Sequence, residues 1–195
     1  LLADPVEKVM EVGGARHPAI RLPSELFAPE RANSEGMDLE DAAVLADIAG
    51  KVAAMPAVPA GIDVGVATAI AAAEAAYPAW SATPVEERAA CLERLADLLE
   101  AHRAPLMAIA VQEAKKTIPD ALAEVREAID FCRYYAARAR EDMRPVELPG
   151  PTGERNVLRY EGRGVWAAIA PWNFPLAIFL GQVAEFGVIL VAEHR

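Results

Sequence analysis

The stretch that decides the fold is Tyr160–Phe179, which reads Tyr-Glu-Gly-Arg-Gly-Val-Trp-Ala-Ala-Ile-Ala-Pro-Trp-Asn-Phe-Pro-Leu-Ala-Ile-Phe. Its middle part, Val165–Ala170, is an apolar run that follows Gly164 and stops at Pro171. A short apolar run bounded by glycine and proline is typical of a buried strand. The sequence therefore predicts a strand over Val165–Ala170.

Two prolines frame the residues that follow this predicted strand. Pro171 and Pro175 enclose Trp-Asn-Phe, and prolines at this spacing disfavour a regular strand and limit a helix to its first turn. The residues from Leu176 onward are apolar and include good helix formers, so we expect a helix to begin at Pro175. This order presents the amide of Asn173 at a turn, where α/β folds commonly bind ligands. On the residues alone, a turn whose aromatic side chains only pack into a core is the alternative.

Composition narrows the class of protein. The 195 residues are 54% hydrophobic and 25% charged, which is typical of a globular chain that holds one domain or parts of two. Asp plus Glu number 29 and Lys plus Arg number 19, which gives a net charge of −10. This charge argues against nucleic acid or an anionic membrane as a partner.

Other features of the sequence bear on its surroundings. Two cysteines are too few for a disulfide framework, so we expect a reducing cytoplasm. The first residues carry neither a basic region nor a long apolar core, so no signal peptide is expected. Prolines and polar residues interrupt the C-terminal apolar stretch, which argues against a membrane span. The three histidines are scattered and predict no metal site.

Helices are predicted along the central part of the chain from caps and helical spacing. Thr83 followed by Pro84 and Glu86 is a strong start signal, and Thr117 with Asp120 is another. The predicted helices cover Leu39–Met55, Val64–Tyr77, Pro84–His102, Pro105–Lys115 and Ile118–Arg140, with Asp38, Asp41 and Asp63 as candidate caps of the first two.

Two of these helices carry an apolar stripe that should face a core. The stripes are Leu92, Leu95, Ala96 and Leu99 in one helix and Leu122, Val125, Ile129, Cys132 and Ala136 in the other. Cys91 and Cys132 lie within amphipathic helices, so we expect both thiols to be structural and not nucleophilic. Glu124 and Glu127 are expected to lie on a charged face toward solvent.

A hairpin and a connector complete the predicted elements. Pro145–Pro149 and Arg155–Glu161 are predicted strands joined by a turn rich in glycine and proline. An unpaired apolar edge is a liability for a monomer, so we expect homo-oligomers that form through this hairpin, residues 145–161. Leu1–Met37 is predicted to be an extended connector with one helical turn near Val6–Met10.

The proline-framed stretch resembles the aldehyde dehydrogenase superfamily. The matching motif consists of Ile169, Pro171, Trp172, Asn173, Phe174 and Pro175. The resemblance implies an α/β, aldehyde dehydrogenase-like fold of which this chain is the N-terminal portion: a helical bundle, a β-hairpin arm and the first strand of the NAD-binding domain.

The same resemblance implies roles for the motif residues. It implies that the amide of Asn173 forms the oxyanion hole, a task for which an uncharged N–H donor is suited. It implies that Ile169, Ala170, Pro171 and Trp172 lie along the cofactor NAD. Phe174 would contact the aldehyde substrate.

A second resemblance covers the N-terminal part. The segment His17–Leu39 is similar to the one that precedes the aldehyde dehydrogenase domain in the proline utilization A family. That family joins a proline dehydrogenase, which carries FAD, to an L-glutamate-γ-semialdehyde dehydrogenase, which uses NAD. The resemblance implies a connector over residues 1–37 and a partial aldehyde dehydrogenase domain over 38–195.

The sequence departs from the family at two places. Lys115 replaces the glycine of the family's Glu-x-Gly-Lys-Thr segment, and a lysine in a left-handed conformation would cost about 1 kcal/mol. From about Glu185 the match is lost, and the family's Lys-Pro pair, whose lysine helps to hold the cofactor ribose, is missing. The family's nucleophilic cysteine and its glutamate general base would lie beyond residue 195.

Two hypotheses follow from these observations. The first is a fragment of an NAD-dependent dehydrogenase that converts L-glutamate γ-semialdehyde to L-glutamate in proline catabolism, inactive as this chain alone. The second is a non-catalytic oligomerisation or interaction module derived from an aldehyde dehydrogenase. A cooperatively melting homo-oligomer of this chain would favour the module, whereas an aggregating chain would favour the fragment.

Overall fold

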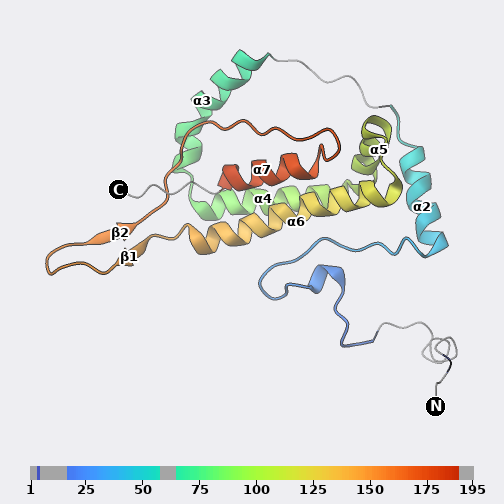
Figure 1. Cartoon of the computed structure of the whole chain (residues 1–195), viewed down its shortest axis with the longest axis horizontal. Helices are drawn as coiled ribbons and strands as arrows, with labels where there is room; N and C mark the ends of the chain where they lie inside the picture. The colour runs from blue at the N-terminus through green and yellow to red at the C-terminus, as the bar shows by residue number, and fades with distance from the viewer. Residues whose placement is uncertain (1–3, 5–16, 58–64, 189–195) are drawn as a thin grey trace.

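The computed structural model describes residue 4 and residues 17–57 and 65–188 of the chain. In these ranges the chain is mostly helical, with one small antiparallel sheet (Figure 1). None of the described helices is both long enough and apolar enough to cross a membrane. The elements in chain order are η1 (Pro23–Glu25), α2 (Ala42–Ala53), α3 (Val66–Ala82), α4 (Val85–Ala101), α5 (Arg103–Ala114), α6 (Ile118–Asp142), β1 (Val146–Leu148), β2 (Asn156–Leu158) and α7 (Ala177–Val188).

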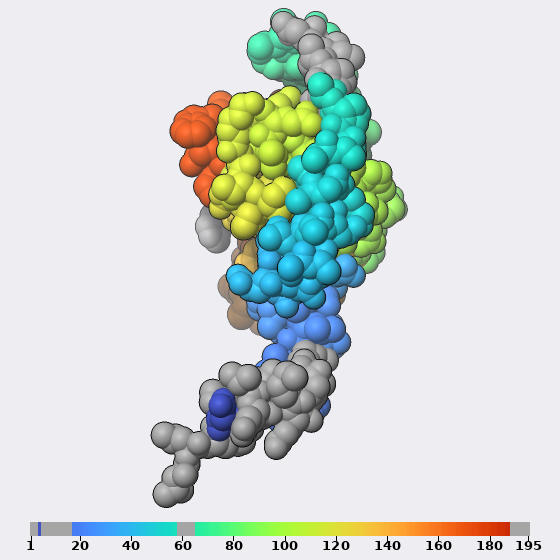
Figure 2. Space-filling view, turned by 90° about the vertical axis from the view of Figure 1, so that its right-hand side faces the viewer, coloured from blue at the N-terminus to red at the C-terminus, as the bar shows by residue number. Residues whose placement is uncertain are grey.

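Helix α6 is the centre of the structure, because α4, α5 and α7 all lie against it (Figure 1). Helix α7 approaches α6 closely at Gly181, where a Cβ atom would lie 3.1 Å from the ring of Phe131. Helix α2 lies against α5, and Figure 2 shows α2 on this side of the molecule with the blue connector below it. The predicted stripes are confirmed as core: Leu92, Ala96, Leu99, Leu122, Val125, Ile129, Cys132 and Ala136 are buried, and Leu95 packs against them.

The ends of α2 and α3 differ from the prediction. The carboxylate of Asp41 accepts the N–H groups of Ala43 and Val44, so α2 begins at Ala42 and not at Leu39. Helix α3 continues through Pro78 to Ala82, beyond the predicted end at Tyr77. Asp63, the predicted cap of α3, and the predicted helical turn near residues 6–10 lie outside the described residues.

The predicted cap of α4 is wrong. The Thr83 hydroxyl donates to the carbonyl of Ala79, 3.0 Å away, so it closes α3 and does not begin α4. Pro84 is the residue before the first helical position of α4, and it makes no side-chain cap. A hydroxyl between two helices can either donate to a carbonyl of the preceding helix or accept an N–H group of the following one. Here the Thr83 hydroxyl donates to the preceding helix.

The junction between α5 and α6 confirms two predictions. Lys115 has φ 56° and ψ 34°, the left-handed conformation expected of the missing glycine, and Lys116 N–H donates back to Ala110 O across it. Thr117 caps α6, since its Oγ1 lies 3.3 Å from the N–H of Asp120 that it accepts.

The predicted hairpin forms, but the predicted strand after it does not. Strands β1 and β2 pair antiparallel, with Val146 opposite Leu158 and Leu148 opposite Asn156. Residues 165–170 have no regular strand structure and run beside α7 as an irregular segment (Figure 1). A strand needs a neighbour for its backbone groups, and no strand of the described residues lies next to this segment. The strand predicted over residues 165–170 is therefore not formed.

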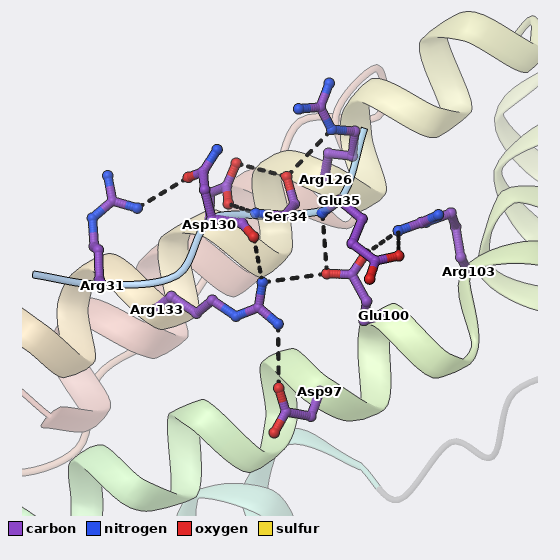
Figure 3. A network of polar contacts seen from close by, with 10 residues as sticks. Arg31, Ser34, Glu35, Asp97, Glu100, Arg103, Arg126, Asp130 and Arg133 are labelled. Carbon is purple, nitrogen blue, oxygen red and sulfur yellow. Dashed lines mark hydrogen bonds and ion pairs between the residues drawn. The ribbon is translucent and has the colours of Figure 1, made fainter. Parts of the chain in front are cut away.

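The connector is attached to α6 by Ser34. The carboxylate of Asp130 accepts the Ser34 N–H at 2.6 Å and the Ser34 hydroxyl at 2.9 Å (Figure 3). Arg126 Nε lies 3.3 Å from the same hydroxyl oxygen. Ser34 is fully buried by these contacts, so this part of the predicted connector is fixed against the helices.

Arg133 of α6 completes the attachment. Its guanidinium donates to the carbonyl of Asn33 at 2.8 Å and reaches Glu100 and Asp97 of α4 at 3.3 and 3.2 Å (Figure 3). Glu100 also pairs with Arg103. We call Asn33, Ser34, Asp130 and Arg133 the connector clamp. It joins the connector, α6 and, through Arg133, α4 in one polar network.

Replacing Lys115 with glycine should stabilise the chain. Glycine adopts the left-handed backbone without the clash of a Cβ atom, so we expect the free energy of unfolding to rise by about 0.5–1 kcal/mol. Urea titration followed by circular dichroism would measure the change. Lys115→Ala is the control, because alanine keeps the clash and should give no gain. An equal gain in both variants would contradict this explanation.

The thiol of Cys132 should be unreactive in the folded chain. Burial raises its pKa to about 11, so at pH 8 roughly one thiol in a thousand is ionised. In the Cys91→Ser variant at pH 8, a disulfide reagent should label Cys132 only after urea is added. In the folded variant without urea, the labelling rate of Cys132 should rise as the pH approaches 11. The Cys132→Ser variant is the control, since Cys91 is only half-buried. Fast labelling of folded Cys91→Ser protein at pH 8 would show that the thiol is accessible.

Candidate functional site

The proline-framed residues form a tight turn at the surface. The N–H of Phe174 donates to the carbonyl of Pro171 at 3.1 Å, which closes a four-residue turn with Asn173 in its third position. Asn173 is exposed. In Figure 2 the orange-red atoms, which belong to the part of the chain between residues 160 and 180, lie at the surface of the molecule. The amide of Asn173 is thus carried by a constrained backbone and remains accessible.

The other predicted site residues lie in the same exposed segment. Ile169 and Trp172 are 77% and 84% exposed, and Phe174 is 38% exposed. Pro171 is exposed and Ala170 is half-buried. The structure therefore brings the predicted residues together in one loop, with large apolar side chains turned toward solvent.

The N-terminal side of the turn is held by Gln182 of α7. Its Oε1 accepts the N–H of Ile169 at 2.7 Å, and its Nε2 donates to the carbonyl of Ile169 at 3.0 Å. One carboxamide thus satisfies both backbone groups of a residue that has no strand partner. Sequence reasoning missed this contact, although a glutamine within a largely apolar helix was visible.

The C-terminal side of the turn is held by Glu124 of α6. Its Oε1 accepts the N–H groups of Leu176 at 3.0 Å and Ala177 at 3.4 Å, at the start of α7. The side chain is fully buried, so the prediction of a solvent face for Glu124 is wrong. Glu127 is exposed, as predicted. The signal was present in the sequence, because Glu124 falls at helical spacing between buried alanines of α6.

Lys116 lies beside both Glu124 and the turn. Its Nζ is 3.3 Å from Oε2 of Glu124, within reach of an ion pair although the geometry is not that of a hydrogen bond. The same ammonium group lies 4.3 Å from the centre of the Phe174 ring, a cation–π contact. Lys116 therefore links the buried carboxylate to the residue next to Asn173.

A separate apolar cleft of about 320 Å³ lies between α3, the segment after the hairpin and α7. Trp166 and Phe186 stack there at 4.6 Å between ring centres, and the indole N–H of Trp80 donates to the carbonyl of Gly187 at 2.8 Å. Of the predicted site residues, none lines this cleft. It shares Gln182 with the supports of the Asn173 turn.

The chemistry available at the turn is hydrogen-bond donation without charge. An amide N–H on a rigid backbone can stabilise an oxygen that becomes negative during a reaction, and it does not titrate. The supports of the turn, Gln182, Glu124 and Lys116, come from different parts of the chain, and they act on backbone groups and on Phe174. Asn173 is thus the reactive-site candidate, and the other polar residues hold the chain before and after it.

Comparison with known proteins gives a consistent result. Residues 40–187 match the model of the aldehyde dehydrogenase family. The bifunctional protein PutA of Klebsiella aerogenes is 37% identical over 94% of this chain and 16% of its own length. The 1-pyrroline-5-carboxylate dehydrogenase 2 of Bacillus subtilis is 40% identical over 58% of this chain and 22% of its own length.

Solved structures agree with the sequence comparison. A crystal structure of a bifunctional proline utilization A protein superposes with a TM-score of 0.81 at 46% identity, over 93% of this chain and 19% of that one. The chain thus spans less than a quarter of the length of these relatives. The family model covers most of the chain, including the proline-framed turn and its supports. The chain therefore belongs to the aldehyde dehydrogenase family.

Proposed function

We propose that this chain is the N-terminal part of the aldehyde dehydrogenase domain of an NAD-dependent enzyme that oxidises L-glutamate γ-semialdehyde to L-glutamate. The observation that carries the proposal is the exposed amide of Asn173 in a turn that is held on both sides. The similarity to PutA and to 1-pyrroline-5-carboxylate dehydrogenases supports this substrate. In such an enzyme the pathway is proline catabolism.

Each residue of the turn has a role in this proposal. Asn173 donates an N–H to the aldehyde oxygen as it becomes negative, which lowers the barrier to nucleophilic attack. NAD would lie along Ile169–Trp172, where exposed apolar side chains offer surface for a flat ring, and it would accept the hydride. Phe174 would contact the substrate. FAD would belong to a proline dehydrogenase domain and not to these residues.

The nucleophile is assigned to a part of the enzyme outside this chain. Aldehyde oxidation through a covalent intermediate needs a thiolate and a base that activates water. Burial raises the pKa of Cys132 to about 11, which makes it a poor nucleophile, and Cys91 lies on α4. Neither cysteine belongs to the turn that carries Asn173.

The hairpin supports a proposal for assembly. Val146 and Leu148 of β1 are 48% and 44% exposed, and a two-stranded hairpin is marginal by itself. We propose that residues 145–161 pair with a second subunit, which would cover these side chains. This surface is also what an interaction module without catalysis would use.

The purified 195-residue chain should form no NADH from L-glutamate γ-semialdehyde and NAD. The physical reason is that Cys132 is buried and that neither cysteine belongs to the turn that carries Asn173. Absorbance at the NADH wavelength would measure the rate, with the intact PutA of Klebsiella aerogenes as the positive control. Turnover by the chain alone would refute the assignment of the nucleophile elsewhere.

Loss of the Asn173 amide should slow the chemical step of the assembled enzyme. In a chimaera, residues 40–187 of this chain replace the matching segment of the Klebsiella PutA, and Asn173→Ala is introduced. We expect kcat to fall about 10²–10³-fold with KM nearly unchanged, because an oxyanion donor acts mainly in the transition state. Steady-state NADH formation would give both constants.

The matched control is Gln112→Ala, which removes another carboxamide, from α5, where it donates to the carbonyls of Met55 and Pro56. It should leave kcat within about twofold of the parent chimaera, the size of effect expected away from a reacting centre. A near-normal kcat for Asn173→Ala would remove Asn173 from the mechanism.

A further inference from the structure

The buried carboxylate of Glu124 requires an explanation. Burying a charge is costly, and replacing a buried ion pair with apolar residues is often neutral or stabilising. Glu124 is fully buried, and Lys116 beside it is 10% exposed. The neighbouring positions on this face of α6, Ala121, Val125 and Ala128, are apolar. An apolar residue at position 124 would therefore pack equally well. The presence of a carboxylate there indicates that Glu124 positions another part of the chain.

The groups that Glu124 binds define that role. Leu176, directly before α7, and Ala177, its first residue, carry N–H groups that have no partner within the helix. A local cap is unavailable, because the residues before α7 are Pro175 and Leu176 and neither has a side-chain acceptor. The cap comes instead from a residue 52 positions earlier in the chain. The start of α7 therefore cannot shift along the helix axis without leaving a buried carboxylate unpaired.

Lys116 acts on the same, C-terminal side of the turn. It follows Lys115, whose left-handed backbone ends α5. Its ammonium group touches Oε2 of Glu124 and the ring of Phe174. Lys116 thus holds the residue directly after Asn173, and Glu124 holds the helix start three residues after it.

We propose that Glu124 and Lys116 are positioning residues that fix the orientation of the Asn173 amide. Glu124 fixes the backbone after the turn, and Lys116 fixes the Phe174 side chain and neutralises the carboxylate. The catalytic consequence rests on the proposed function of Asn173. The effect of Glu124 and Lys116 on the position of the backbone can be measured in this chain by itself, without an activity assay.

Amide hydrogen exchange of the full chain, resolved by residue with NMR, tests the position. In Glu124→Ala, the amides of Leu176 and Ala177 should exchange about fivefold to tenfold faster, the change expected from loss of a helix cap. Amides of residues 92–99 in α4 should not change. Glu127→Ala, an exposed glutamate of the same helix, should change neither group. Unaltered exchange at Leu176 and Ala177, or equal acceleration in α4, would overturn the proposal.

Two milder variants keep the test decisive if Glu124→Ala does not fold. Glu124→Gln retains a carbonyl acceptor for both N–H groups, so exchange at Leu176 and Ala177 should stay within about twofold of the parent. Lys116→Met removes the ammonium group, so the Phe174 amide should exchange about twofold to fivefold faster, the equivalent of one cation–π contact. Fast exchange at Leu176 in Glu124→Gln, or an unchanged Phe174 amide in Lys116→Met, would count against the respective role.

The same variants in the chimaera separate position from catalysis. Glu124→Ala removes the acceptor of both N–H groups, so kcat should fall by about tenfold with KM unchanged. Combined with Asn173→Ala, it should give little further loss, since it acts through Asn173. Additive losses would show that Glu124 does not act through Asn173. If Asn173→Ala leaves kcat unchanged while the exchange results hold, the proposed function fails and the positional inference stands.

Discussion

The burial of α6 is the constraint on which the rest of the structure depends. The helix is surrounded by α4, α5 and α7, so most of its sides meet another element and few positions are free to face water. Its apolar side chains supply the core, and its polar side chains meet specific partners. Glu124 meets the start of α7, while Asp130 and Arg133 meet the connector. The position of the turn and the position of the connector are thus both set by one helix.

This arrangement explains why the charged residues of α6 are so well paired. A helix with several packed sides cannot direct every charge to solvent, so its charges must be satisfied by neighbours. Arg133 bridges the connector and α4, and Arg140 pairs with Glu86 and Glu93 of α4. These pairs raise the pKa of Arg140 and lower that of Glu93. The ion pairs add little stability when exposed, but they fix how the helices lie against each other.

Local signals predicted the helices well because caps act over three or four residues. Thr117 began α6, and the left-handed Lys115 ended α5. The turn that carries Asn173 was predictable for the same reason, since proline constrains its own backbone and that of the preceding residue. The family motif then gave the turn a chemical role, which a single sequence could not supply from spacing alone.

Long-range contacts were beyond the reach of these signals. Glu124 looked like a surface glutamate because its partners, Leu176 and Ala177, are more than 50 positions away. The expected strand over residues 165–170 failed for a related reason: its apolar run fits a strand, but a strand forms only beside another. Thr83 could have capped either of two helices, and only the geometry of their junction decided between them.

The connector clamp has a consequence for the order of events during synthesis. The Ser34–Asp130 and Asn33–Arg133 contacts span 96 and 100 positions. At ribosomal rates, Ser34 leaves the ribosome roughly 5–20 s before Asp130 does. During that interval the partners of Asn33 and Ser34 do not yet exist, and the connector has nothing in α6 to bind. Clamp closure therefore follows the completion of α6, so a docked connector marks a nascent chain whose central helix has already been made.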